Sequence, residues 1–313
     1  MIYLKINGAC GNQFFQYAFA RMVQEKTGGE LIIDYQYVRR NSILWAGSDN
    51  LLKDFNVVPY QYLSRPKNPK LVCILAINLI KRLFRLHNFE KRTYHFYLWL
   101  ARHLERFGIY YFDTAFYPFH FYRNKNIIIR GYFESPRYFE EIDEKICKEL
   151  MPKHPLLEQN IELYKVITGK PSVCITIRRL NVENPDLHDV YQYEMDYFYH
   201  AMDYIREREP KAVWIVFSDS IEWCKENFQP VGEVYYETPD NPIWEKIRLM
   251  SSCKHFIIHN STFSWWAQHL SQNPDKIVVA PAKWMQRDDQ PIDIYEDNWI
   301  YMTNNGEEKS YHD

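Results

Sequence analysis

Short apolar runs alternate with amphipathic segments along the chain, and the alternation starts at its first residues. Residues 2–6 form an apolar run suited to a buried strand, residues 12–26 have the spacing of an amphipathic helix, and residues 31–34 form a second apolar run. A second series follows later, with strands predicted at 172–177, 212–217, 234–236, 255–258 and 276–280. Strands that alternate with helices are typical of a mostly parallel sheet covered on both faces, so the pattern predicts an α/β protein.

The two series indicate two domains. Between them lie a helical middle, a short strand at 126–130 and the polar, proline-containing stretch MPKHPLLEQN at 151–160. A chain of 313 residues is long enough for two domains of ordinary size. We therefore predict two Rossmann-like α/β domains facing a cleft, residues 1–155 with a helical insertion and residues 156–313.

Residues 70–106 mix apolar side chains with many lysines and arginines at helical spacing. One interpretation is a pair of helices packed on the N-terminal domain with a solvated basic face. The other is a segment that lies on an anionic membrane surface. No run reaches the roughly 18 to 20 apolar residues that span a bilayer.

Charge and cysteine usage narrow the class of protein. The formal net charge of −2 provides no global basic field to attract nucleic acid. The six cysteines form no CxxC pair, which fits a reducing compartment, and no signal peptide is recognisable. The expected location is the cytoplasm, with peripheral contact at the inner face of the membrane under the second interpretation of residues 70–106.

The stretch TIRRLN places two adjacent arginines, Arg178 and Arg179, at the end of a buried strand. Neighbouring side chains of an extended segment point to opposite faces, so the two arginines have different tasks. An arginine fork is well suited to gripping a phosphate through two parallel hydrogen bonds. The alternative is a structural pair bound to acidic residues such as Asp196.

Two further strand ends carry polar groups. In HNSTFSWW, the side chains of Asn260, Ser261, Thr262 and Ser264 surround a helix start that favours an anion. In FSDSIEWCK, Asp219 could accept hydrogen bonds from ribose hydroxyls or from the edge of guanine. Ordinary helix capping explains both patterns equally well.

The stretch NGACGNQFFQYAFAR at residues 7–21 leaves the first strand through two glycines and enters a helix. It is neither GxGxxG nor a phosphate loop, so its polar pair Asn12-Gln13 serves another purpose. The chain also lacks DxD, HExxH and a cluster of cysteine and histidine. No metal is therefore expected, and arginines with a helix N-terminus must stabilise any departing diphosphate.

Together these stretches resemble the α-1,2-fucosyltransferases of glycosyltransferase family 11, especially the bacterial ones. GACGNQFFQYAFAR is similar to their GxxGNQxFQYA signature, TIRRLN to HxRRxD/N, and FSDSIEWCK to an FSDD-type segment. RGYFESPRYF and NSTFSWWAQHL…NPDKIVVAPAKW match two further blocks in the same order. The matches extend from residue 4 to about residue 284.

The resemblance implies a GT-B-like fold, GDP-fucose as donor in the C-terminal domain, and an acceptor-side N-terminal domain. It implies an inverting, metal-independent transfer of fucose, without a cofactor, to the 2-hydroxyl of a terminal galactose or a similar sugar. Arg178 and Arg179 would hold the pyrophosphate. The donor-binding set would be Asn181, Asp219, Asn260, Ser261, Thr262 and Ser264. Gly8 and Gly11 would let the backbone approach closely, with Asn12 and Gln13 directed at the fucose or the acceptor.

Two features leave alternatives open. Thr176 stands where the family has histidine, which leaves donor choice open. The polar loop NVENPDLHD offers the carboxylates of Glu183, Asp186 and Asp189 and the imidazole of His188 as general bases, of which we choose Asp186. The alternatives to a fucosyltransferase are a transferase of another GDP-sugar and a non-catalytic glycan- or nucleotide-binding protein.

Overall fold

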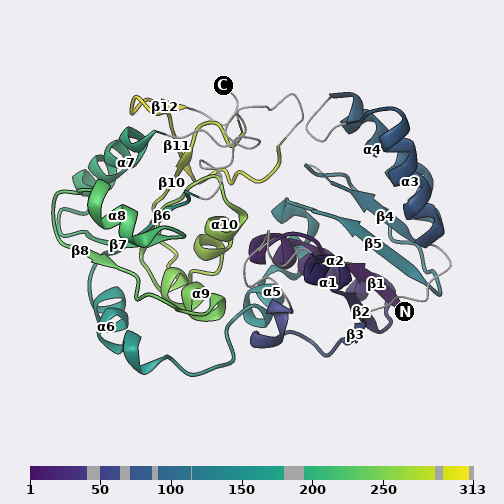
Figure 1. Ribbon diagram of the computed structural model, residues 1–313, viewed down its shortest axis with the longest axis horizontal. Coiled ribbons are helices and arrows are strands. Elements are labelled where there is room, and N and C mark those ends of the chain that lie inside the picture. Colours follow the sequence, from purple (N-terminus) through teal and green to yellow (C-terminus); the bar gives the residue numbers. More distant parts are fainter. Residues whose placement is uncertain are drawn as a thin grey trace. The chain divides into compact units, whose positions relative to one another are not determined.

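The structure is a computed structural model that describes residues 1–40, 50–63, 71–86, 91–113, 115–179, 194–285 and 292–309. These residues divide into two compact units. The first unit holds residues 1–150 with 292–294, and the second holds 151–285 with 295–309. Each unit is described by itself (Figure 1).

The first unit is built on a parallel sheet of five strands in the order β3-β2-β1-β5-β4. Its strands are β1 (Ile2–Lys5), β2 (Leu31–Asp34), β3 (Gln61–Leu63), β4 (Ile109–Phe112) and β5 (Ile127–Gly131). Strands β1, β2 and β4 are buried almost throughout, as expected for a parallel sheet covered on both faces. All carboxyl ends lie at one edge, where polar residues can meet.

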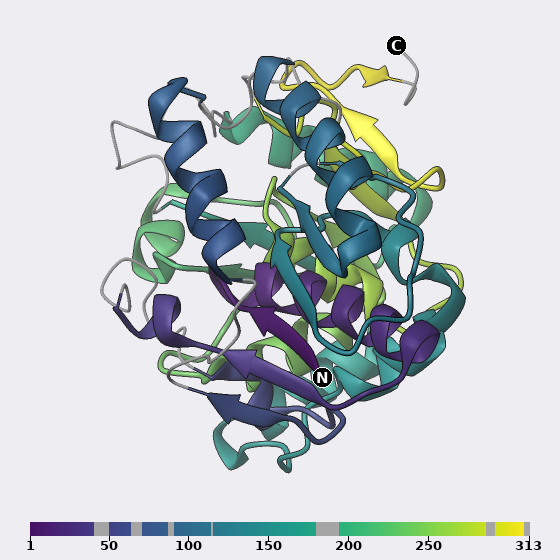
Figure 2. The ribbon, with the colours of Figure 1, turned by 90° about the vertical axis from the view of Figure 1, so that its right-hand side faces the viewer.

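Helices cover this sheet (Figure 2). They are α1 (Cys10–Thr27), α2 (Gln36–Arg40), α3 (Leu71–Leu83), α4 (Lys91–Leu104) and α5 (Asp143–Glu149). Helix α1 is buried over most of its length because its aromatic side chains pack into the core. Phe19 of α1 stacks on Phe133 with ring centroids 4.1 Å apart. Much of the aromatic content of this unit thus serves core packing.

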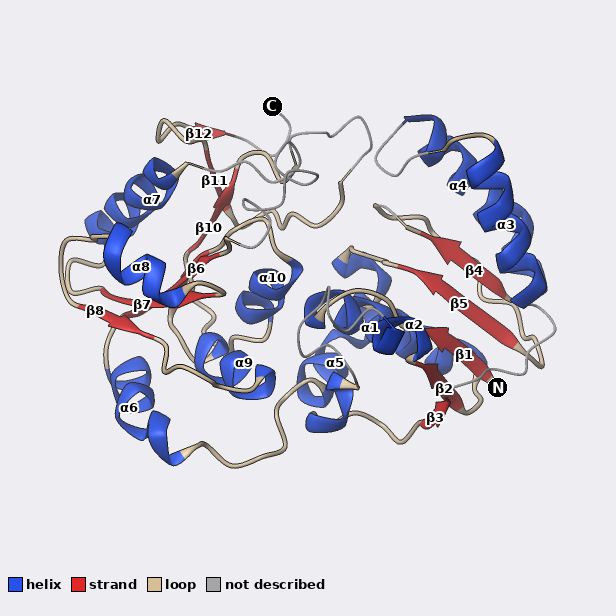
Figure 3. Ribbon diagram, viewed as in Figure 1, coloured by secondary structure: helices blue, strands red, loops and turns tan. Residues whose placement is uncertain are grey.

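The second unit contains a sheet of seven strands in the order β12-β11-β10-β9-β6-β7-β8, parallel except for β12. Its strands are β6 (Ser172–Ile177), β7 (Val213–Ser218), β8 (Val234–Tyr236), β9 (His255–Ile257), β10 (Val278–Pro281), β11 (Ile300–Met302) and β12 (Glu308–Lys309). Its helices are α6 (Ile161–Gly169), α7 (Met195–Arg208), α8 (Ile221–Asn227), α9 (Ile243–Ser251) and α10 (Thr262–His269). Figure 3 shows α7 and α8 on one side of the strands and α9 and α10 on the other.

The predicted α/β class, with two units built on parallel sheets, is confirmed. Strands β3, β4, β11 and β12 were not predicted, and β4 overlaps the start of the aromatic stretch at 110–122. The pair of helices predicted within 70–106 is present as α3 and α4. Among the described residues, no helix is long and apolar enough to cross a membrane.

Candidate functional site

The two arginines follow β6, an interior strand of the second sheet. Strand β6 pairs with β7 on one side and β9 on the other, so the carboxyl ends of three strands lie next to one another. Ile177 is opposite Ser218, which brings Arg178 and Arg179 level with Asp219. The turn after β9 leads to the other predicted donor-binding residues. The sequence therefore folds most of these candidates to one edge of one sheet.

Arg179 is held in place by two contacts. Its backbone N–H donates a hydrogen bond to Oδ1 of Asp219 over 2.7 Å. Its guanidinium carbon lies 3.7 Å from the ring centroid of Trp223 on α8, which is a close cation–π contact. The two contacts fix the guanidinium beside the end of β7, and Asp219 contributes to this by accepting the backbone hydrogen bond. Trp223 was not singled out from the sequence, although it lies within FSDSIEWCK.

The positive charge of Arg178 acts on a buried imidazole. His259 is 1% exposed, and burial together with the nearby Arg178 lowers the pKa of its imidazole to about 3. The ring is therefore neutral at physiological pH and adds no second positive charge beside Arg178. His259 precedes the Asn260 turn directly, and its position after a buried strand was the signal that could have identified it.

Thr176 links the end of β6 to the turn after β9. Its Oγ1 accepts a hydrogen bond from the backbone N–H of His259 over 3.1 Å, and both residues are buried. The residue at the position of the family histidine therefore fixes the turn after β9 relative to β6.

The start of α10 carries the hydroxyl groups that the sequence indicated. Ser261 occupies the N-cap position with an extended backbone, but its hydroxyl makes no capping hydrogen bond. Ser261 and Ser264 are buried, whereas Thr262 is half-buried. Asn260 is held by a 2.8 Å hydrogen bond from its Nδ2 to the carbonyl oxygen of Trp284. This helix start has the dipole and the donors that suit an anion.

Two predicted residues, Asn181 and Asp186, lie outside the described residues. The same holds for the other proposed bases of that loop, Glu183, His188 and Asp189. Their assigned roles stay predictions.

The N-terminal signature forms a tight turn in the first unit. Gly8 has φ +77°, and a Cβ there would lie 2.5 Å from Nδ2 of Asn12. Gln13 is fully buried and donates from Nε2 to the carbonyl oxygen of Gly8 over 3.3 Å. Gly11 is buried in the first turn of α1, and Asn12 is half-buried. Glycine is therefore required at position 8, and a role of Asn12 or Gln13 toward a sugar stays a prediction.

Asn7, just before this turn, was missed from the sequence. Its backbone N–H donates to Oε1 of Gln16 and its carbonyl oxygen accepts from Nε2 of Gln16, each over 2.9 Å. Its Nδ2 donates to the hydroxyl of Tyr132 over 2.9 Å. These bonds fix Asn7 at the carboxyl edge of the first sheet.

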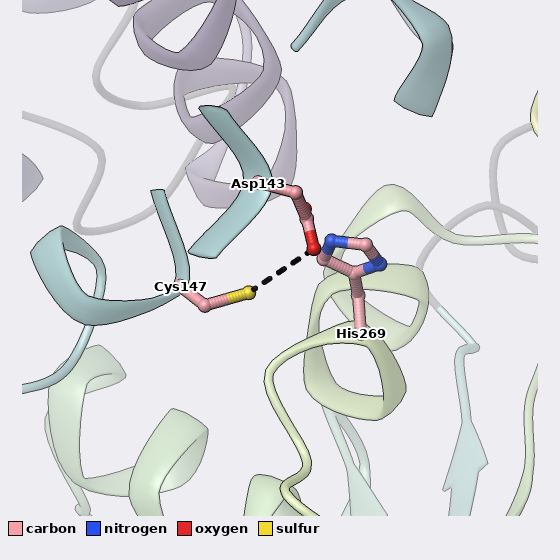
Figure 4. Close-up of side chains that lie close together, drawn as sticks. All are labelled: Asp143, Cys147 and His269. Carbon is pink, nitrogen blue, oxygen red and sulfur yellow. Dashed lines mark hydrogen bonds between the residues drawn. The ribbon is translucent and has the colours of Figure 1, made fainter. Parts of the chain in front are cut away.

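Within each unit, the described residues hold no group of three histidine, cysteine, aspartate or glutamate side chains close enough to share an ion. Asp143 and Cys147 lie one turn apart on α5, with 4.0 Å between the sulfur and a carboxylate oxygen (Figure 4). His269, which the figure also labels, belongs to the second unit. Its ring stacks on Trp265, and its Nδ1 lies 3.5 Å from Oε1 of Glu296.

Solved structures show the same fold at low sequence identity. The fucosyltransferase NodZ from Bradyrhizobium matches with a TM-score of 0.52 and 14% identity, over 85% of this chain and 91% of that one. A mutant of Arabidopsis thaliana FUT1 in complex with GDP matches with a TM-score of 0.50 and 13% identity, over 88% of this chain and 69% of that one. The predicted GT-B-like class is confirmed.

Sequence comparison identifies the family. The O-antigen biosynthesis glycosyltransferase WbnK of Escherichia coli is 28% identical over 96% of this chain and 100% of its own length. An alpha-1,2-colitosyltransferase of Escherichia coli is 34% identical over 54% of this chain and 60% of its own length. The model of glycosyl transferase family 11 matches residues 1–303. The chain is a member of glycosyl transferase family 11.

Proposed function

We propose that the protein transfers L-fucose from GDP-fucose to the 2-hydroxyl of a terminal galactose, or a similar sugar, of a glycan. The transfer inverts the configuration at the fucose and needs no metal ion. The observation that carries the proposal is the placement of Arg178, Arg179 and Asp219 at adjacent strand ends, beside the turn that opens α10. Family membership supports the transfer chemistry, and a structure of NodZ soaked with GDP-fucose supports the fold for such a donor.

The arginines act on the leaving group in this mechanism. As the bond between fucose and phosphate breaks, negative charge grows on the phosphate and positive charge on the sugar ring. Arg179 is already oriented by Asp219 and Trp223, so it meets the phosphate with little reorganisation. Arg178 adds a second charge beside the neutral His259, and the N–H groups of α10 supply further donors. These groups replace the divalent cation that other transferases place at the diphosphate.

The acceptor hydroxyl has to lose a proton as it attacks from the opposite face of the sugar ring. We assign this proton transfer to Asp186, the carboxylate chosen in the polar loop after the arginines. The loop follows β6 directly, at the strand end where ligands of parallel sheets bind. Asn181 in the same loop is assigned to the donor.

The test is a transfer reaction with a panel of galactose-terminated glycans. We expect GDP-fucose to yield a product with α-linked fucose on the 2-hydroxyl of galactose, identified by NMR, at a rate that EDTA does not change. A collapse of activity with EDTA would contradict the metal-independent mechanism. A β-linked product would contradict inversion.

A second candidate donor is a GDP-linked 3-deoxy sugar. The 34% identity with the colitosyltransferase favours it, and colitose is the 3-deoxy counterpart of fucose. A site that hydrogen-bonds the 3-hydroxyl would reject the deoxy donor strongly. Competition between the two donors in one reaction, scored by the mass of the product, decides between them.

A further inference from the structure

The first unit contains a polar pocket of about 200 Å³ at the carboxyl edge of its sheet. Lys5 comes from the end of β1, Arg130 and Gly131 come from the end of β5, and Asp113 follows β4. Helix α3 contributes Lys81, so a helix side chain lines the pocket together with the strand ends. None of the residues predicted from the sequence as site residues lines this pocket.

The pocket lining carries more positively charged than negatively charged side chains. Three of its lining residues are cationic, Lys5, Lys81 and Arg130, and one is a carboxylate, Asp113. Lys81 lies 3.8 Å from Asp113, which also accepts a 2.6 Å hydrogen bond from the hydroxyl of Tyr97. Burial lowers the pKa of the Lys81 ammonium, Asp113 opposes this, and Arg130 lowers it further. The two cations therefore repel each other across a single carboxylate.

Arg130 has no carboxylate within ion-pair distance among the described residues. Its guanidinium carbon lies 6.0 Å from the ring centroid of Tyr111, an aromatic contact that orients it without neutralising it. Beside it, Oδ1 of Asn7 is buried and accepts no hydrogen bond from any residue that the structure describes. The lining thus combines an unneutralised guanidinium with an amide acceptor that suits a hydroxyl donor.

We propose that this pocket binds an anionic group, a carboxylate or a phosphate, carried by the sugar acceptor. The inference rests on the proposed function and on the acceptor-side role that the family resemblance implies for the N-terminal domain. Arg130 binds the anion through its planar fork, and Lys5 adds charge. Oδ1 of Asn7 accepts a hydrogen bond from a hydroxyl of the same sugar. The acceptor class is therefore an acidic glycan, in which a negative group lies near the galactose-type residue that is modified.

Binding of three matched sugars to the donor-free protein tests this proposal. The probes are methyl galactoside, galacturonic acid and galactose 6-phosphate, which present no charge, a carboxylate and a phosphate on similar rings. Ligand-observed NMR should show that one or both anionic sugars bind about tenfold or more tightly than the neutral one. Whichever of the two anionic sugars binds more tightly shows whether the pocket prefers a carboxylate or a phosphate.

Two variants and a control locate the effect. Arg130→Gln should abolish the preference for the anion and leave the neutral sugar unchanged, whereas Arg130→Lys should keep part of it. Arg123→Gln removes an exposed arginine of the same unit outside the pocket and should change nothing. Equal binding of charged and neutral sugars, or an anion preference that survives Arg130→Gln, would overturn the proposal. Turnover of GDP-fucose is measured separately, so loss of the proposed function remains distinguishable from loss of the anion site.

An independent observation concerns the outer face of α3. Val72, Leu75, Leu79 and Leu83 are 67%, 67%, 57% and 69% exposed. At about 100° per residue these four positions form one narrow stripe. Ile74, Ile77 and the pocket residue Lys81 fall on the opposite side of the helix, where Ile74 and Ile77 are buried. Helix α3 therefore packs on its own unit with one face and presents an apolar stripe with the other.

We also infer that this stripe docks on an anionic membrane surface. The choice of occupant follows from charge: neither α3 nor α4 contains an acidic residue, and besides the pocket residue Lys81 they carry Arg82, Lys91, Arg92 and Arg102. Exposed Arg82 lies in the last turn of α3, and exposed Arg85 lies just beyond it. A stripe of leucines edged by cations is the pattern of a helix that lies in the lipid interface.

Vesicle co-sedimentation tests the docking. The full chain should bind vesicles of phosphatidylcholine with phosphatidylglycerol and should bind pure phosphatidylcholine far less. The double variant Leu75→Asp/Leu79→Asp should lose at least about tenfold in affinity, because each charge has to enter the interface. Val231→Asp, at a 74% exposed position of the second unit, is the control and should bind normally. Equal binding by the double variant, or a dimer in solution that the double variant disrupts, would overturn the inference.

Discussion

Replacing Arg178 by alanine is expected to lower kcat/KM for fucosyl transfer by about 10³-fold, which corresponds to about 4 kcal/mol of transition-state stabilisation. The loss is large because the charge on the departing phosphate is met at Arg178 inside a partly buried site, beside a neutral imidazole. Initial rates at varied GDP-fucose, with saturating acceptor, measure the effect. Most of the loss should appear in kcat, because the interaction strengthens as the phosphate gains charge.

Arg178→Lys separates charge from fork geometry. It should recover part of the rate, since it keeps the charge and loses the bidentate contact. Arg208→Ala is the control, because Arg208 is exposed on α7 and donates to the carbonyl oxygen of Tyr204. Unchanged GDP binding and unchanged turnover in Arg178→Ala would show that the diphosphate binds elsewhere. Thermal unfolding of each variant shows whether the fold is intact.

The fold could be predicted from the sequence wherever local pattern and burial agree. Strand β2 is an apolar run at 31–34, and the structure places it there because both of its faces are covered. Strand β4 was missed because Tyr110, Tyr111 and Phe112 belong to a long aromatic stretch in which no alternation marks a strand. Its burial comes from packing against α4 and from pairing with β5. The strand therefore forms because of tertiary contacts, which the local sequence pattern does not reveal.

The residues of the candidate site could be predicted from the sequence, but the contacts between them could not. Strand ends in a parallel sheet gather at one edge, so Arg179 and Asp219 could be expected near each other from topology. That Asp219 would bind the backbone N–H of Arg179, and that Trp223 would lie under its guanidinium, depends on side-chain directions that no spacing encodes. The pocket around Arg130 was missed for a related reason. Its lining comes from five separate elements, β1, α2, α3, β4 and β5, and no single stretch of sequence contains its charge pattern.

Gly131→Ala is expected to lower the free energy of unfolding of the first unit by about 3 kcal/mol or more. Gly131 ends β5 opposite Phe112 of β4 and has φ +152°. A Cβ there would lie 1.8 Å from the carbonyl oxygen of Phe112 and 2.7 Å from its carbonyl carbon. Both atoms belong to the backbone of a buried strand and cannot rotate away, so β4 and β5 would have to separate. Amide hydrogen exchange of residues 109–112 and 127–131 measures the change in this unit alone.

Gly169→Ala is the matched control, because the same substitution at the end of α6 meets no atom of the described residues within 4 Å. It should be neutral or stabilise slightly, since alanine is favoured over glycine in a helix by about 1 kcal/mol. Gly131 also lines the polar pocket, so a Gly131→Ala protein that still folds should bind the anionic sugars more weakly, through displacement of Arg130. Native exchange rates in both segments, together with undiminished sugar binding, would mean that β4 and β5 tolerate a side chain at this position. The close approach of the two strands would then have no part in shaping the pocket.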